Sequence, residues 1–98
     1  ALVPASGTVF ALRVHGESMK DAGILDGDIV MAHRQESAER GDIIVAQLGD
    51  EATVKRYAPD HDCIRLLPEN ESFEPIVVSL DAVDFSIAGK VVGLMRRM

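Results

Sequence analysis

Short apolar segments rich in β-branched residues recur roughly every ten residues along the chain, and turn signals separate them. Twice the turn is a Gly-Asp pair that leads directly into apolar residues, as GDIV and GDII. Strong helix signals are absent, and at most a turn or two is expected at SMKDAG or ESAER. This pattern predicts an all-β, mainly antiparallel domain of short, strongly twisted sheets. The expected strands cover residues 9–15, 28–34, 42–48, 52–57, 63–67, 75–80 and 87–95.

Length and charge limit what such a domain can bind. The chain has 98 residues, 47% of them hydrophobic, which is enough for one domain with one modest core. A net charge of −6 argues against direct binding of nucleic acid by this domain and against docking on an anionic membrane. No apolar run approaches the roughly 20 residues of a membrane helix. Residues 1–8 are expected to be a residual linker, and residues 9–98 the domain itself.

Metal and cofactor sites are not predicted. The histidines at positions 15, 33 and 61 are scattered, and the single cysteine, Cys63, makes neither a zinc site nor an intrachain disulfide. One cysteine fits a reducing compartment. The segment GILDGD lacks the lysine of a phosphate-binding loop. Its aspartates, Asp26 and Asp28, are expected to accept backbone hydrogen bonds in turns. We therefore expect no metal and no cofactor.

Ser18 is a candidate nucleophile, because it lies between a strand that ends near His15 and a turn marked by glycines. Such a junction can expose consecutive backbone N–H groups that would stabilise an oxyanion. A serine hydroxyl needs a base within hydrogen-bond reach, and Lys55 in the apolar segment ATVKRY is the candidate. Period-two alternation places Thr53, Lys55 and Tyr57 on one strand face. If that face is buried, desolvation lowers the pKa of Lys55, and the neutral amine can accept the proton of Ser18. Spacing alone leaves open whether Ser18 is a nucleophile or an ordinary turn residue.

Four separated segments resemble the LexA/UmuD family of self-cleaving serine proteases. They are GESMKDAGILDGDIV, EATVKRY, LLPENESFEPIVV and IAGKVVGLMRR, in the family order and covering about Val9 to Met98. The 37-residue interval between Ser18 and Lys55 also suits the family. The resemblance implies a LexA/signal-peptidase-like fold.

The resemblance also implies the roles of individual residues. Ser18 matches the nucleophile and Lys55 the general base. The backbone amides of Glu17 and Ser18 match the oxyanion hole, and Met19 is expected to line the cleft. Pairing of C-terminal strands implies a homodimer. The interface residues would be Val91, Val92, Gly93, Leu94, Met95 and Arg96.

The function that this family implies is self-cleavage of a transcriptional repressor of the SOS response to DNA damage. Members cut one bond, usually Ala–Gly, upstream in their own chain, and an activated RecA filament stimulates the cut. We therefore expect RecA as a partner, the chain's own upstream loop as substrate, and a bacterial cytoplasmic location without membrane attachment.

Departures from the family pattern keep alternatives open. Neither the N-terminal helix-turn-helix domain nor the cleavage loop is expected in these 98 residues. The two Ala–Gly pairs present, Ala22–Gly23 and Ala88–Gly89, lie in segments interpreted as scaffold. A type I signal peptidase shares a Ser-Met segment and a lysine strand but needs a membrane anchor. An UmuD-like accessory module of an error-prone DNA polymerase, or a dimerisation module with an inert dyad, would show the same residues.

Overall fold

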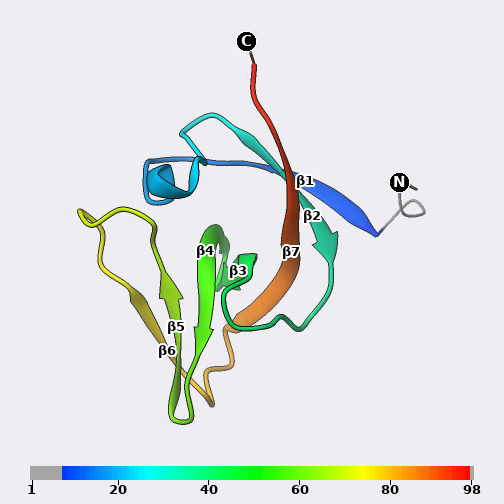
Figure 1. Ribbon diagram of the computed structural model, residues 1–98. Coiled ribbons are helices and arrows are strands. Elements are labelled where there is room, and N and C mark those ends of the chain that lie inside the picture. Colours follow the sequence, from blue (N-terminus) through cyan, green and yellow to red (C-terminus); the bar gives the residue numbers. More distant parts are fainter. Residues whose placement is uncertain (1–7, 98) are drawn as a thin grey trace.

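A computed structural model describes residues 8–97 (Figure 1). Seven strands form one sheet in the order β1-β2-β7-β3-β4-β5-β6, and every neighbouring pair is antiparallel. A 3₁₀ turn at Lys20–Ala22 is the one helical element in this part of the chain. The all-β, antiparallel prediction is confirmed, and of the two segments where at most a helical turn was expected, SMKDAG forms one. The strands are β1 (Val9–Arg13), β2 (Ile29–Arg34), β3 (Ile43–Leu48), β4 (Glu51–Pro59), β5 (Cys63–Leu67), β6 (Ile76–Ser79) and β7 (Phe85–Met95).

The long strand β7 joins the two halves of the sheet. Its first part, Phe85–Lys90, pairs with β3, and its second part, Gly89–Met95, pairs with β2. Register shifts lie between Met31 and Ala32 on β2 and between Val45 and Ala46 on β3. Such bulges bend a strand and increase its twist. The strands therefore form one curled sheet rather than several separate ones, and Figure 1 shows β7 curving through its centre.

Strand β3 is buried on both faces of this sheet. Because successive side chains alternate across a strand, Val45 packs into one core cluster while Ile44 and Ala46 pack into a second. The first cluster contains Val14, Met19, Ile24, Val30, Ala32, Val45 and Val54. The second contains Ile44, Ala46, Leu66, Val78 and Ile87. The curled sheet thus has an apolar cluster on each side of β3, and Val14 and Val54 share the first although they come from different halves of the fold.

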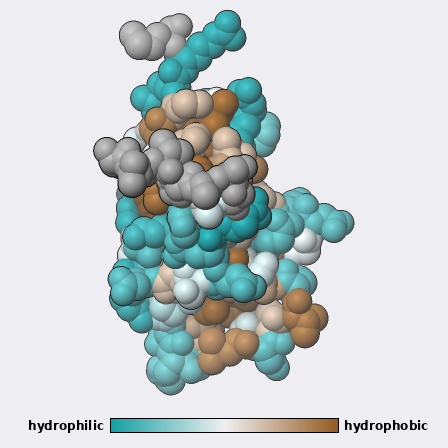
Figure 2. Space-filling view, turned by 90° about the vertical axis from the view of Figure 1, so that its right-hand side faces the viewer, coloured by the Kyte–Doolittle hydropathy of each residue, from teal (hydrophilic) through white to brown (hydrophobic). Residues whose placement is uncertain are grey.

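Part of the molecular surface is apolar. Figure 2 views the side of the molecule that carries β1, β2 and β7, and its hydrophilic surface is interrupted by apolar side chains at the upper part and near the lower end. Exposed apolar residues include Val92, Leu94 and Met95 near the end of β7.

The predicted linker over residues 1–8 lies outside the described residues except for Thr8. None of the helical structure in residues 8–97 is long and apolar enough to cross a membrane.

Gly89 lies on β7 where strands approach too closely for a side chain. A Cβ there would lie 2.6 Å from the carbonyl oxygen of His33 and 2.8 Å from the ring of Phe10. We predict that Gly89→Ala lowers the free energy of unfolding by about 1–3 kcal/mol, the usual effect of overpacking. Urea unfolding measures this. Gly93→Ala on the same strand is the matched control, because its Cβ would meet Met31 at an ordinary 3.6 Å. Equal effects of the two substitutions would contradict this account.

Candidate active site

Ser18 lies in the loop between β1 and β2, whose conformation depends on glycine. Gly16, directly before Glu17 and Ser18, has a positive φ of 87°. Residues with a side chain disfavour this left-handed backbone conformation. The N–H of Gly16 donates to Asp26 Oδ1 (2.7 Å), and the N–H of Gly27 donates to the carbonyl of Val14 (2.8 Å). The two ends of the loop are therefore tied together.

Met19 anchors this loop in the core. Its side chain is 1% exposed and is a member of the first core cluster. It also lines the cavity at Ser18. The side chain of Met19 thus lies at the wall of the cavity and is also a main apolar contact of the loop. Burial of Met19 holds the adjacent Ser18 at the surface of the core.

The end of the loop is fixed by an ion pair that the sequence analysis missed. Asp28 is buried, and its carboxylate accepts two hydrogen bonds from Arg96 (2.8 and 2.7 Å) and one from the N–H of Leu25 (2.7 Å). The pKa of Asp28 is lowered to about 2, mainly by the hydrogen bond from Arg96 and next by the hydrogen bond from the N–H of Leu25. Arg96 also donates to the carbonyl of Gly23 (2.7 Å). Besides the backbone hydrogen bond of a turn residue, Asp28 thus has the ion pair with Arg96.

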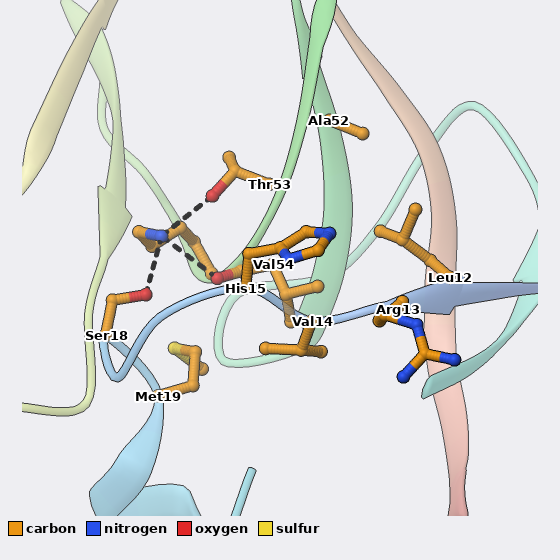
Figure 3. Close-up of a pocket in the computed structure, with 10 residues that line it drawn as sticks. Leu12, Arg13, Val14, His15, Ser18, Met19, Ala52, Thr53 and Val54 are labelled. Carbon is orange, nitrogen blue, oxygen red and sulfur yellow. Dashed lines mark hydrogen bonds between the residues drawn. The ribbon is translucent and has the colours of Figure 1, made fainter. Parts of the chain in front are cut away.

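Lys55 reaches Ser18 from strand β4. It lies opposite Ile44 in the β3–β4 register, and its side chain is 7% exposed. Its Nζ lies 2.9 Å from Ser18 Oγ, 2.8 Å from Thr53 Oγ1 and 3.2 Å from the carbonyl oxygen of Val54. These contacts are the dashed lines in Figure 3. The two residues singled out 37 positions apart in the sequence therefore touch.

The electrostatic surroundings of Lys55 favour its neutral form. No carboxylate within residues 8–97 forms an ion pair with it, and burial lowers its pKa below the ordinary 10.5. A neutral amine has two N–H donors and one lone pair. Thr53 Oγ1 and the Val54 carbonyl can accept the two N–H bonds, which leaves the lone pair for the proton of Ser18. The geometry thus suits proton transfer from Ser18 to Lys55.

Two backbone N–H groups beside Ser18 are candidates for stabilising an oxyanion. Within the described part of the chain, the N–H groups of Glu17 and Ser18 take part in no hydrogen bond. Their carbonyls, in contrast, both accept hydrogen bonds. Free, adjacent donors next to a hydroxyl are what the tetrahedral state of acyl transfer requires.

A cavity of about 90 Å³ opens beside Ser18 and is lined from two strands (Figure 3). Leu12 to His15 line one side, and Ala52 to Lys55 line the other. Strand β1 is an edge of the sheet, and β4 pairs with β5 only from Arg56 onward. Both walls therefore offer unpaired strand edges to an extended chain. His15 lines the cavity, but no hydrogen bond within residues 8–97 joins it to Ser18 or Lys55.

Three residues that contact the dyad loops were not singled out from the sequence. Strand alternation places Thr53 on the face of Lys55 but gives it no role in the site. Glu69 and Asn70 belong to the loop between β5 and β6 and bind the backbone of the Ser18 loop. Their contacts span about fifty residues and leave no local pattern.

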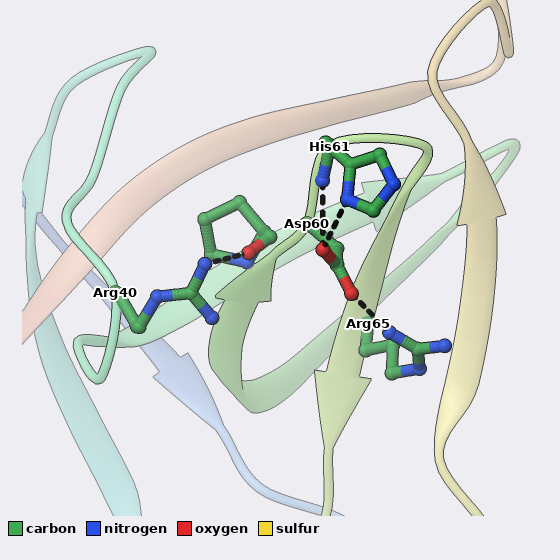
Figure 4. Close-up of polar contacts among 5 residues, drawn as sticks. Arg40, Asp60, His61 and Arg65 are labelled. Atoms are coloured by element: carbon green, nitrogen blue, oxygen red, sulfur yellow. Dashed lines mark hydrogen bonds and ion pairs between the residues drawn. The ribbon is translucent and has the colours of Figure 1, made fainter.

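A second polar group lies away from this cavity, at the β4–β5 turn (Figure 4). Donor atoms of Asp60, His61 and Asp62 lie within 4.8 Å of one another, and all three residues are exposed. Both oxygens of Asp60 are already engaged, one by His61 and the other by Arg65 at 2.9 Å. The N–H of His61 and the guanidinium of Arg65 hold the pKa of Asp60 below its usual value. We assign no metal to this group, and the absence of a metal site stays a prediction.

Comparison with known proteins identifies the class to which this fold and cavity belong. Residues 1–92 match the family described as Peptidase S24-like, and the chain belongs to that family. The LexA repressor of Caldicellulosiruptor saccharolyticus is 57% identical over 91% of this chain. The LexA repressors of Herminiimonas arsenicoxydans and Ruminiclostridium cellulolyticum are 54% and 56% identical over 89% and 91% of it. The resemblance to LexA inferred from four sequence segments is confirmed.

The matched region covers only part of each relative. The chain spans 42%, 40% and 40% of the lengths of these three repressors. The fold of a serine peptidase family is therefore established for the chain. The reaction, its substrate and its partners are questions for the functional proposal.

The burial of Lys55 predicts a pH-dependent stability. Because the pKa of Lys55 is lower in the folded state than the unfolded 10.5, the unfolded chain binds more protons between those two values. Burial of Lys55 is therefore least favourable below its folded-state pKa. The free energy of unfolding increases as pH rises from that folded-state pKa to 10.5. We predict that the free energy of unfolding of wild type rises across this window relative to that of Lys55→Met.

Urea unfolding of wild type and Lys55→Met at a series of pH values checks this. Lys20→Met, which removes an exposed lysine of the same region, is the matched control. A difference between wild type and Lys55→Met that stays constant with pH would contradict the proposed burial.

Proposed function

We propose that the chain is the C-terminal, self-cleaving and dimerising domain of a LexA-type repressor of the SOS response, acting in the bacterial cytoplasm. One observation carries the proposal: the buried amine of Lys55 lies 2.9 Å from Ser18 Oγ. The LexA names of the three relatives favour a repressor over an UmuD-like accessory module. The proposed substrate is an Ala–Gly bond upstream in the same chain, and the proposed stimulus is an activated RecA filament.

In the proposed reaction, Ser18 Oγ attacks the carbonyl carbon of the scissile bond while its proton passes to Lys55 Nζ. The carbonyl π electrons move to the oxygen, which receives hydrogen bonds from the N–H groups of Glu17 and Ser18. The Lys55 ammonium then gives its proton to the leaving amine, and an ester to Ser18 remains. Water, deprotonated by Lys55, hydrolyses this ester and releases the serine.

The open strand edges support an extended substrate. The edge of β1 and the first half of β4 form opposite walls of the cavity. A peptide lying between them could pair with either strand through its backbone, the mode called strand addition. In this mode the reactive carbonyl is held by backbone hydrogen bonds, so few side-chain contacts are needed. A small residue such as alanine before the scissile bond would suit the limited cavity volume of about 90 Å³.

The pH dependence of self-cleavage tests the dyad. We predict that the full-length protein cleaves itself faster as pH rises, with a midpoint below 10.5, because only neutral Lys55 accepts the Ser18 proton. Ser18→Ala should abolish cleavage, and Lys55→Ala should slow it by about a hundredfold or more. Gel analysis of purified protein, with and without activated RecA filament, measures the rates. Thermal unfolding of each variant controls for folding.

Several outcomes would contradict the proposal. Unchanged cleavage in Ser18→Ala would remove the nucleophile, and a rate that falls as pH rises with the fold intact would remove lysine as base. A full-length wild type that never cleaves would instead indicate a dimerisation module with an inert dyad.

The proposed dimer interface is the end of β7. The edge of β7 that pairs with β3 is open after Lys90, while its other edge remains paired with β2 through Met95. Val92 and Leu94 are 59% and 42% exposed there. An open strand edge flanked by exposed apolar side chains favours pairing with a second copy. Arg96, which is also in the predicted interface, donates hydrogen bonds to Asp28 of its own chain.

A charge placed on this edge should weaken the dimer. We predict that Val92→Glu raises the dissociation constant of the dimer at least about tenfold, equivalent to ~1.4 kcal/mol, because like charges from two copies would meet. Sedimentation velocity over a concentration series measures the change. Val77→Glu, at a valine on β6 that is 63% exposed, is the matched control. A wild type that stays monomeric at high micromolar concentration would contradict the interface.

A further inference from the structure

The loop between β5 and β6 grips the backbone that carries Ser18. The N–H of Glu69 donates to the carbonyl of Ser18 (2.7 Å), and the N–H of Asp21 donates to the carbonyl of Glu69 (2.8 Å). The side-chain amide of Asn70 donates through Nδ2 to the carbonyl of Glu17 (2.9 Å). Figure 1 shows this loop beside the turn that follows Ser18. Two successive carbonyls of the Ser18 loop are thus held from the same side.

Both ends of the Asn70 amide are occupied. Its Oδ1 accepts a hydrogen bond from the N–H of Ser72 (3.0 Å), while its Nδ2 donates to Glu17. A backbone N–H needs an acceptor and a carbonyl needs a donor, so the amide can satisfy both in one orientation only. The same loop is tied to the strand of Lys55, because Glu69 Oε1 accepts a hydrogen bond from Arg56 Nε (3.0 Å) and forms an ion pair with Nη2 (2.9 Å).

Fixing the Glu17 carbonyl also fixes the N–H of Ser18. The two groups belong to one peptide unit, which is planar and trans, so they point in opposite directions. With its carbonyl held by Asn70, the unit directs the Ser18 N–H away from the β5–β6 loop. That N–H has no acceptor among residues 8–97, although Ser18 is partly buried. The hydrogen bond from Asn70 therefore orients a free donor next to the hydroxyl.

We propose that Asn70 is a positioning residue that holds the Ser18 N–H in the orientation needed to bind an oxyanion. The proposal rests on the proposed peptidase function of Ser18 and Lys55. Asn70 itself touches neither the hydroxyl nor the amine, and it acts only through the Glu17–Ser18 peptide. Loss of its donor leaves the Glu17 carbonyl with only the longer hydrogen bond from the Lys20 N–H (3.2 Å), so the peptide is held less firmly and the hydrogen bond to the developing negative charge is weakened.

Asn70→Asp tests the donor of the amide separately from its acceptor. The carboxylate keeps an acceptor for the Ser72 N–H but loses the donor, and it repels the Glu17 carbonyl. In the full-length protein we expect the plateau rate of self-cleavage at high pH to fall by about tenfold to a hundredfold. The larger value is about the effect on the rate of removing one oxyanion donor completely. The plateau is compared because Lys55 is neutral there in both proteins. Glu71→Ala, whose side chain makes no polar contact within residues 8–97, should cleave as wild type does.

Inhibitor binding distinguishes positioning from a merely structural role. A short peptide boronic acid ending in alanine forms a tetrahedral anion on the serine, whereas the same peptide as a carboxamide does not. We expect Asn70→Asp to weaken binding of the boronic acid by the factor seen in the plateau rate and to leave carboxamide binding unchanged. Fluorescence titration measures both.

The outcomes separate this proposal from the functional one. A plateau rate in Asn70→Asp within twofold of wild type, or equal losses for both peptides, would overturn the role of Asn70 alone. A wild type that neither cleaves nor binds the boronic acid more tightly than the carboxamide would overturn the proposed function and this role with it. Thermal unfolding confirms that each variant is folded.

Discussion

The burial of one amine organises the site. Lys55 lies on a strand whose neighbour, β3, is apolar on both faces, and its Nζ is surrounded by three oxygens that carry no full charge. A carboxylate in this position would stabilise the ammonium and remove the lone pair that the proposed reaction needs. The described residues supply hydroxyl and carbonyl partners instead. The hydrogen bonds that satisfy the amine are therefore compatible with its lowered pKa.

This arrangement requires Ser18 to be held from outside the lysine strand. The loop that carries it is anchored by Met19 in the core, by the Asp28–Arg96 pair at its end, and by Glu69 and Asn70 across its backbone. These contacts come from three separate regions of the chain. A short loop with a left-handed glycine at its start has little stability of its own, so its conformation depends on these neighbours. The rigidity of the proposed nucleophile is thus a property of the whole fold.

Local patterns predicted most of the fold and the pair at its centre. Strand alternation gave the seven strands and the face shared by Thr53 and Lys55, because both depend on neighbouring residues. The joining of all strands into one sheet depends on β7 pairing first with β3 and then with β2, which no local pattern encodes. The partners of Arg96 and Asn70 were missed for the same reason, since each contact spans more than fifty residues. Local chemistry made Ser18 and Lys55 a candidate pair, and the family resemblance was what favoured this pair over an ordinary turn serine.

The position of β7 in the sequence has a consequence for synthesis. The strand that joins the two halves of the sheet follows the other six strands of residues 8–97 in the sequence, and Arg96 comes after it. During translation, β1–β2 and β3–β4 can pair as neighbours before β7, which pairs with β2 and β3, has been made. The serine and the lysine are thus made early and brought into register late. The contact between Ser18 and Lys55 therefore depends on a strand that follows both residues in the sequence.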